Sequence, residues 1–373
     1  MKVVAAIDSF KGSMTSMEAG NAVKKGILAA KPDAEVVVNP LADGGEGTVD
    51  ALIEGLGAKK IPVTVTGPLG EKVSCYYGFL EETKSAVMEM ASAAGITLVT
   101  KKDPLRASTY GVGEMIADAL KRGCKNFMIG IGGSATNDGG IGMLKALGFE
   151  FFDEDGNDVG EGAAALAKIE VIRTENKNPL LSGAKFQIAC DVKNPLCGKQ
   201  GATYIFGPQK GVTEEQKEQV DEAMRHYADV TKESLDCDFA DCEGAGAAGG
   251  LGYAFLSYLA GELIPGVEMI LQATGLEEKM KNADVVVTGE GRLDAQTVMG
   301  KAPAGVAALA KKYNAKVIAF AGSVAPEAKV CNRAGIDAFF PIVRGVATLE
   351  EAMKKENAME NIAATAEQVF RLL

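Results

Sequence analysis

Short apolar runs alternate along the chain with glycine-rich polar loops and with helical patterns. VVAAI (3–7) is typical of a buried strand, and the loop DSFKGSMT leads from it into a segment with Ala19, Val23 and Ile27 on one helical face. Ser13 or Thr15 is the expected cap of that helix. The same order of strand, loop and helix recurs at 35–49 and 126–148, and 283–294 is a buried strand followed by a glycine loop. Strands that alternate with helices predict an α/β fold with a parallel sheet.

A different pattern begins near residue 60 and predicts a second domain. Residues 60–91 contain three apolar stretches joined by turns at GPLG and EETK, which favours antiparallel strands. The chain has 373 residues, and a typical domain has about 150, so two domains are expected. We predict a discontinuous parallel α/β domain (1–66 plus 281–373), an inserted mixed α/β domain (67–280) and an active-site cleft between them.

Charge and cysteine usage narrow the class of protein. The 39 Lys and Arg against 50 Asp and Glu give a net charge of −11, which argues against a nucleic-acid or anionic-membrane partner but allows a small anionic substrate. Seven cysteines without a C-x-x-C pair predict neither a disulfide framework nor a zinc ribbon. The first apolar run is too short for a secretion signal, so a cytoplasmic protein is expected. The uncharged stretch 244–261 holds six glycines, which favours a glycine loop and a buried helix over a membrane span.

Several familiar chemistries are excluded by the motifs that the chain lacks. The nearest approach to a P-loop ends in Gly300-Lys301-Ala302 and has no Ser or Thr after the lysine. His226 is the only histidine, which argues against a zinc site of the H-E-x-x-H type and against a Ser-His-Asp triad. GAGAAG (244–249) matches G-x-G-x-x-G only formally, because CDFADCE before it is not an apolar strand.

Glycines and acidic or amide side chains gather directly after five predicted strands. In an open α/β sheet, that carboxyl edge is where ligands bind. The five loops contribute Asp8, Ser9, Lys11 and Gly12; Asp43, Gly44, Gly45 and Glu46; Gly132, Gly133, Ser134, Thr136, Asn137, Asp138 and Gly139; Asp191, Lys193 and Asn194; and Gly289, Glu290, Gly291, Arg292 and Asp294.

Phosphoryl transfer is the chemistry that needs this mixture of residues. Glycine-loop N–H groups bind phosphates, one or two carboxylates hold Mg²⁺, and a Lys or Arg neutralises the transferring group. We expect Lys11, Asp191, Arg292 and Asp294 to be catalytic, Asp191 as the base or hydroxyl-orienting group and Asp294 as a metal-linked or capping residue. Asp43 and Glu290 are the predicted metal ligands. The predicted substrate- and phosphate-binding residues are Asp8, Ser9, Gly44, Gly45, Glu46, Gly132, Gly133, Ser134, Thr136, Asn137, Asn194, Gly289 and Gly291.

Turns and helix caps would explain any one of these loops equally well, because Asp, Asn and Gly favour both. Five such loops on one predicted edge favour a function. Two roles fit Lys301 equally well. It is either a phosphate ligand or an ordinary residue at a helix N-terminus.

Six long segments resemble the class I glycerate kinase family, in the family's order and over essentially the whole chain. They are AIDSFKGSMTSMEAG, PLADGGEGT, GIGGSATNDGGIGMLKALG, CDVKNPLCGKQGA, FGPQKG and TGEGRLDAQTVMGKAP. The resemblance implies transfer of the γ-phosphoryl group of ATP to D-glycerate with Mg²⁺, giving 2-phosphoglycerate. It also implies two α/β domains, one flavodoxin-like and one resembling restriction endonucleases.

Alternatives remain open at this point. Phosphorylation at the 3-hydroxyl, or of another small hydroxy acid, fits the same charges. A phosphatase or another Mg²⁺-dependent transferase could use the same loops. A nucleotide-binding sensor without chemistry is the third reading, but it has no need of an acceptor-side carboxylate such as Asp191. The sequence leaves a homo-oligomer open.

Overall fold

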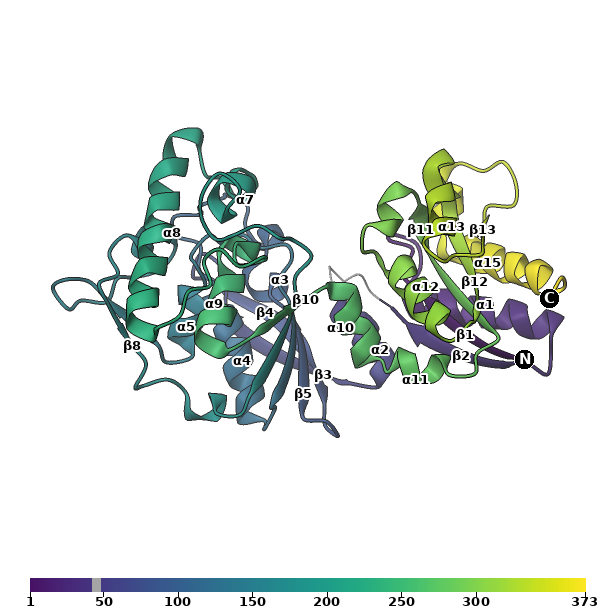
Figure 1. The fold of residues 1–373 in the computed structure, drawn as a ribbon, viewed down its shortest axis with the longest axis horizontal. Coiled ribbons are helices and arrows are strands. Elements are labelled where there is room, and N and C mark those ends of the chain that lie inside the picture. The colour runs from purple at the N-terminus through teal and green to yellow at the C-terminus, as the bar shows by residue number, and fades with distance from the viewer. Residues whose placement is uncertain (42–47) are drawn as a thin grey trace. The chain divides into compact units, whose positions relative to one another are not determined.

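Two compact units make up the chain in the computed structural model, which describes residues 1–41 and 48–373 (Figure 1). Of the described residues, the first unit includes 1–41, 50–57 and 267–373, and the second includes 48–49 and 58–266. The sequence places these limits at 67 and 280 instead. The difference at the first limit has a simple cause, because residues 59–66 pair along their whole length with the next strand of the second unit.

A parallel sheet forms the centre of the first unit, in the order β13-β12-β11-β1-β2. Its strands are β1 (Lys2–Ile7), β2 (Glu35–Pro40), β11 (Val285–Leu293), β12 (Lys316–Val324) and β13 (Ala338–Pro341). Numbered along this unit alone, the order is 2-1-3-4-5, the flavodoxin-like order, with the switch of direction between β1 and β11. Val3 pairs with Val285 on one side and with Val36 on the other. The predicted α/β class with a parallel sheet is confirmed.

Helices cover this sheet because alternate strand residues point to opposite faces. Val3, Ala5 and Ile7 pack in one apolar cluster with α1 (Ser16–Ala30) and α15 (Lys355–Phe370). Thr15 caps α1 and forms a capping box with Glu18. The other helices of this unit are α2 (Thr48–Leu56), α10 (Gly266–Ala273), α11 (Leu276–Met280), η4 (Ala295–Val298), α12 (Ala302–Lys312), η5 (Pro326–Lys329), α13 (Val330–Arg333) and α14 (Leu349–Met353).

A mixed sheet forms the centre of the second unit, in the order β10-β9-β6-β5-β4-β3. The predicted antiparallel strands are β3 (Lys59–Thr66), β4 (Lys72–Leu80) and β5 (Ser85–Glu89), and their pairing is confirmed. The remaining strands, β6 (Asn126–Gly130), β9 (Lys185–Ala189) and β10 (Glu262–Ile264), continue the sheet in parallel. The fold class of two α/β domains, one with a parallel and one with a mixed sheet, is therefore confirmed.

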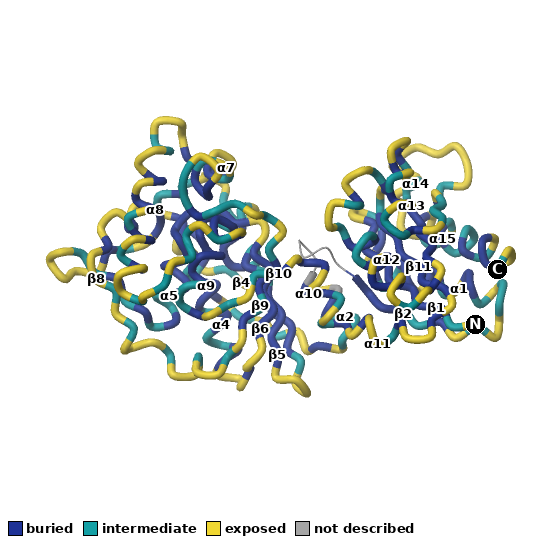
Figure 2. The backbone as a smooth tube through the Cα atoms, viewed as in Figure 1, coloured by how far each residue is buried: buried dark blue, intermediate teal, exposed yellow. Residues whose placement is uncertain are grey.

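Helices and a small hairpin complete the second unit. They are α3 (Ala91–Ala94), η1 (Ile96–Leu98), α4 (Tyr110–Lys121), α5 (Ile141–Ala146), β7 (Glu150–Phe152), α6 (Ala163–Leu166), β8 (Val171–Arg173), η2 (Pro179–Leu181), α7 (Ala202–Lys210), α8 (Glu214–Leu235), η3 (Ala247–Gly249) and α9 (Leu251–Leu259). The stretch 244–261 forms η3 and the largely buried α9, as predicted. Figure 2 shows that burial is concentrated in the strands of each sheet and the helix faces against them. Within the described ranges, every helix is too short or too polar to cross a membrane.

Candidate functional site

The carboxyl ends of β1 and β11 form the switch point of the parallel sheet. The loop after β1 and the end of β11 lie side by side there, and the Asp8 N–H donates a hydrogen bond of 3.0 Å to the Gly289 carbonyl. The sequence predicts a loop from 289 onward, but β11 continues to Leu293. Arg292 and Leu293 pair with Ser323 and Val324 of β12, and this pairing extends the strand. The predicted residues of these two segments therefore meet at one edge.

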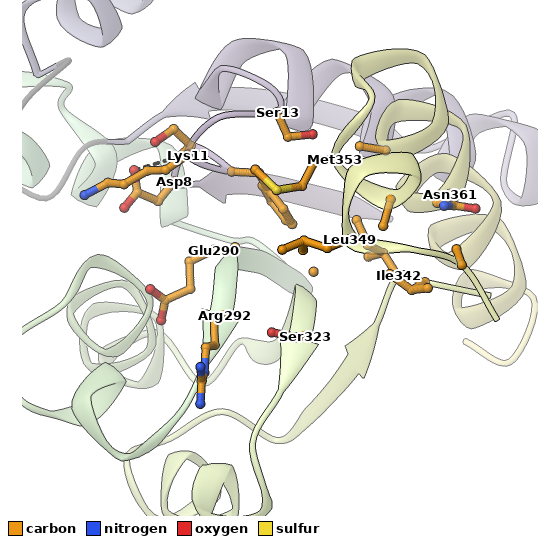
Figure 3. A pocket seen from close by; sticks show the side chains of 18 of the residues that line it. Asp8, Lys11, Ser13, Glu290, Arg292, Ser323, Ile342, Leu349, Met353 and Asn361 are labelled. Carbon is orange, nitrogen blue, oxygen red and sulfur yellow. Dashed lines mark hydrogen bonds between the residues drawn. The ribbon is translucent and has the colours of Figure 1, made fainter. Parts of the chain in front are cut away.

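A pocket of about 660 Å³ opens at this edge, entirely within the first unit (Figure 3). Its volume is in the range of ligand-binding pockets. Predicted residues that line it are Asp8, Ser9, Lys11, Glu290, Gly291, Arg292 and Asp294. Gly289 lies one residue before them in β11, and a Cβ at this position would be 2.2 Å from the Phe320 carbonyl oxygen. Residues predicted from the two segments thus form one wall of the pocket, and their place in a functional site and their roles stay predictions.

Two carboxylates of this wall are buried. Asp8 is 6% exposed and accepts a hydrogen bond of 2.7 Å from the Ser9 N–H. Glu290 is 8% exposed, accepts one of 2.7 Å from the Thr297 hydroxyl, and has the Lys301 ammonium 3.7 Å away. Lys301 therefore lines the pocket beside Glu290.

The chemistry of these donors fits Mg²⁺. Among the residues that the structure describes, no three His, Cys, Asp or Glu side chains gather as a metal cage. Mg²⁺ does not need such a cage, because it commonly binds through one or two carboxylates and substrate phosphates. Asp8 and Glu290 line the same pocket and could supply these carboxylates. The other predicted ligand, Asp43, lies outside the described residues together with Gly44, Gly45 and Glu46.

Asp294 and Arg292 form a loose pair at the mouth of the pocket. Arg292 Nε is 3.6 Å from Asp294 Oδ2, and the arginine side chain is 67% exposed. Asp294 Oδ1 accepts a hydrogen bond of 2.9 Å from the Gln296 N–H, and Asp294 caps η4. Of the two roles that the sequence suggests for Asp294, the structure shows the helix cap. A catalytic or metal-linked role for Asp294 stays a prediction.

The predicted loop after β6 lies in the second unit and is mostly buried. Gly132 and Gly133 are exposed, whereas Ser134, Thr136 and Asn137 are buried. Asn137 Nδ2 donates a hydrogen bond of 3.0 Å to the Thr203 hydroxyl. Of the predicted residues of this loop, the two glycines are therefore the ones exposed at the surface.

Two buried charged side chains, Asp138 of this loop and Lys210 of α7, have no predicted role in the site, although the sequence names Asp138 among the loop residues. Asp138 is fully buried and accepts hydrogen bonds from the Thr109 N–H and hydroxyl, both 2.8 Å, and from the N–H groups of Gly140 and Gly142. Lys210 is 2% exposed and donates one of 2.7 Å to the Thr136 carbonyl. Burial raises the pKa of Asp138 and lowers the pKa of Lys210 to about 7, and the Asp138 charge opposes the lowering. The one feature of the sequence that could have pointed to Lys210 is its place in the unusual segment FGPQKG.

The low pKa of Lys210 predicts that the second unit becomes more stable as the pH rises from about 7. An unfolded lysine has a pKa near 10.5, so between these values the unfolded chain binds more protons than the folded chain, and the free energy of unfolding increases with pH. Lys210→Met should remove part of this increase. Denaturant midpoints of the native and variant proteins at pH 7 and pH 9 measure it. An identical pH dependence in both proteins would contradict the prediction.

Asp191 and Asn194 lie after β9 in the second unit and have local partners. Asp191 is exposed, and its Oδ1 accepts a hydrogen bond of 2.9 Å from the Gly266 N–H at the first residue of α10. Asn194 Nδ2 donates one of 2.7 Å to the Gln200 carbonyl. The structure thus gives Asp191 a structural contact besides its predicted role as base. The predicted cleft between the domains stays a prediction.

The wall of the pocket that lies opposite these charged residues was not predicted from the sequence. This wall comes from residues 342–361 and includes Ile342, Leu349, Met353 and Asn361. No motif marks these residues, because most of them are ordinary apolar positions before and within two helices.

Comparisons with known proteins agree over the full length. A family model described as glycerate kinase family matches residues 3–373. The chain is 44% identical to glycerate kinase of Bacillus subtilis (strain 168), over 99% of this chain and 97% of that protein. It is 45% identical to glycerate 2-kinase of Escherichia coli (strain K12), over 98% of each. A solved structure of a glycerate kinase 2 from Salmonella typhimurium LT2 has a TM-score of 0.91 at 44% identity, covering 99% of this chain and 97% of that one. The resemblance read from the six segments is confirmed, the enzyme is a phosphotransferase, and the chain belongs to the glycerate kinase family.

Proposed function

We propose that this enzyme transfers the γ-phosphoryl group of ATP to D-glycerate with the assistance of Mg²⁺ and forms 2-phosphoglycerate. The observation that carries the proposal is the pocket at the switch point, where Lys11 and Arg292 stand with the buried carboxylates of Asp8 and Glu290. The full-length similarity to a glycerate 2-kinase supports the acceptor and the position of transfer. Seven free cysteines support a cytoplasmic location, since reduced thiols are usual there.

The side chains of the pocket supply the charges that phosphoryl transfer requires. Lys11 and Arg292 would neutralise phosphate oxygens as negative charge shifts toward the leaving group. Asp8 and Glu290 would hold Mg²⁺, which supplies further charge neutralisation when it is bound. Asp191 would orient the acceptor hydroxyl or accept its proton. We assign no part of this step to the only histidine, because His226 lies on α8 and does not line the pocket, and its Nε2 is 2.8 Å from the Ile169 carbonyl oxygen.

A product-resolved assay tests the proposal. The full-length enzyme is incubated with ATP, Mg²⁺ and D-glycerate, and phosphorus NMR follows the products. We expect ADP formation that depends on glycerate, with 2-phosphoglycerate as the product. 3-Phosphoglycerate alone would contradict the position of transfer. Turnover only with a different hydroxy acid would contradict the acceptor, and ATP hydrolysis without any phosphorylated acid would contradict the kinase activity.

Arg292→Lys is expected to lower kcat/KM at least about tenfold, or roughly 1.4 kcal/mol. Lysine keeps the charge but loses the planar fork that binds two oxygens of a phosphate or carboxylate. Steady-state kinetics of the variant measure the effect. Arg371→Lys is the matched control, because Arg371 pairs with Glu367 on α15 and does not line the pocket. Unchanged kinetics in Arg292→Lys would show that Arg292 is an ordinary surface residue.

A further inference from the structure

The pocket of the first unit divides into a charged half and an apolar half. Figure 3 shows Asp8, Lys11, Glu290 and Arg292 at one end, and Ile342, Leu349 and Met353 toward the other. The two halves come from different parts of the chain, the charged one from the ends of β1 and β11 and the apolar one largely from residues 342–361. A ligand that fills the pocket must therefore have a charged part and an apolar part.

Two large apolar side chains of the apolar half are exposed where they line the pocket. Leu349 is 76% exposed and Met353 is 37% exposed, both on the short helix α14. Met353 also touches the loop after β1, since a Cβ on Gly12 would lie 2.9 Å from Met353 Cε. Exposed apolar side chains that line a concave surface are typical of a ligand-binding groove. Apolar side chains of this kind can pack against a heterocyclic base.

One amide in this half can recognise the edge of a base. Asn361 lines the pocket, and its Oδ1 accepts a hydrogen bond of 2.9 Å from Arg344 Nε. This bond fixes which side of the amide is the oxygen, so that Nδ2 is the donor left for a ligand. A ring nitrogen of a purine is an acceptor that could receive it.

The charged half has the mixture of signs that a nucleotide with its metal ion requires. Lys11, Arg292 and Lys301 are suited to phosphate oxygens, and Asp8 and Glu290 are suited to a divalent cation. A three-carbon acid could use one of these cations, but it would fill only a small part of about 660 Å³ and would leave the apolar half empty. The volume and the division of the pocket thus favour the nucleotide over the acceptor.

We propose that this pocket is the nucleotide site of the enzyme. The base lies against Phe10, Leu349 and Met353, and the phosphates lie toward Lys11 and Arg292. The assignment rests on the proposed kinase function for its ligand class, and it places the nucleotide on the parallel-sheet unit. It also gives residues 342–361, which carry no recognisable motif, a role in binding.

Equilibrium binding to the full-length enzyme tests the assignment without turnover. Calorimetry with Mg²⁺ compares ADP, which reaches both halves, with inorganic tripolyphosphate, which has no base. Leu349→Asn combined with Met353→Asn adds no charge and changes two side chains outside the core. We expect ADP to bind at least about tenfold more weakly to this variant and tripolyphosphate to bind within about twofold of the native value. Val346→Asn is the matched control, because Val346 is fully exposed on the same segment but does not line the pocket. It should leave both affinities unchanged.

The outcomes separate this assignment from the proposed function. Native ADP affinity in the double variant, with its circular dichroism unchanged, would overturn the assignment even if glycerate is phosphorylated normally. Equal weakening of ADP and tripolyphosphate would also overturn it, because the base would then make no separate contribution. Selective weakening of ADP would support the assignment even if the native enzyme does not phosphorylate glycerate, in which case only the proposed function fails.

Discussion

Asp191→Asn is expected to lower kcat by about 100-fold or more while ADP binding stays unchanged. The acceptor hydroxyl must lose its proton as the phosphoryl group arrives, and a positioned base usually contributes about this factor. Asparagine is nearly isosteric with aspartate but cannot take the proton. It keeps a side-chain oxygen that can still accept the hydrogen bond from the Gly266 N–H, so the start of α10 should remain in place. Steady-state kinetics with saturating ATP and D-glycerate give kcat, and calorimetry with ADP gives the binding constant.

A matched control separates catalysis from a general effect of charge. Asp155 is exposed on the same unit and lies outside the predicted loops, and Asp155→Asn should leave kcat unchanged. Asp294→Asn is the informative comparison, because Asp294 is a cap with a second candidate role. If Asp191→Asn keeps kcat within about threefold while Asp294→Asn abolishes activity, the two assignments must be exchanged.

Asp138→Ala is expected to lower the free energy of unfolding of the second unit by about 3 kcal/mol or more. Four donors converge on the Asp138 carboxylate, which is fully buried. Alanine would leave these donors without an acceptor, and each unsatisfied buried group costs about 1–3 kcal/mol. It would also leave the ammonium of Lys210 without its nearby negative charge. Denaturant unfolding followed by circular dichroism at pH 7 measures the change.

The control for this experiment is an alanine at an exposed acid. Asp155→Ala should shift the unfolding midpoint little, because surface substitutions away from special features are usually within about 0.5 kcal/mol. Asp138→Asn keeps one oxygen for the Thr109 donors and should therefore lose less stability than Asp138→Ala. A native midpoint in Asp138→Ala would mean that water replaces the carboxylate and that the network does not stabilise this unit.

Local apolar patterns were enough to predict the strands and the sheet classes. A run such as VVAAI can be buried on both faces only in a central strand, and its pairing with β2 and β11 bears this out. The turns at GPLG and EETK likewise fix the antiparallel pairing of β3, β4 and β5, because short connections join neighbouring strands. The meeting of the Asp8 loop with Glu290 follows from the same logic, since β1 and β11 are parallel neighbours and end at one edge.

The sequence could not show which side chains from distant segments become partners. Lys210 reaches the Thr136 carbonyl, and Asp191 reaches the Gly266 N–H, across 74 and 75 positions of the chain. The apolar wall formed by Leu349 and Met353 is likewise far in sequence from the Asp8 loop that faces it. The spacing of apolar residues shows only which face of a segment is buried. It depends on residues within one or two helical turns, or along one strand, and not on the distant segment that covers them. The sequence by itself determined the elements, the two sheets and the family, whereas tertiary packing decided the pocket's second wall, the buried network around Asp138 and the contact of Asp191 with the start of α10.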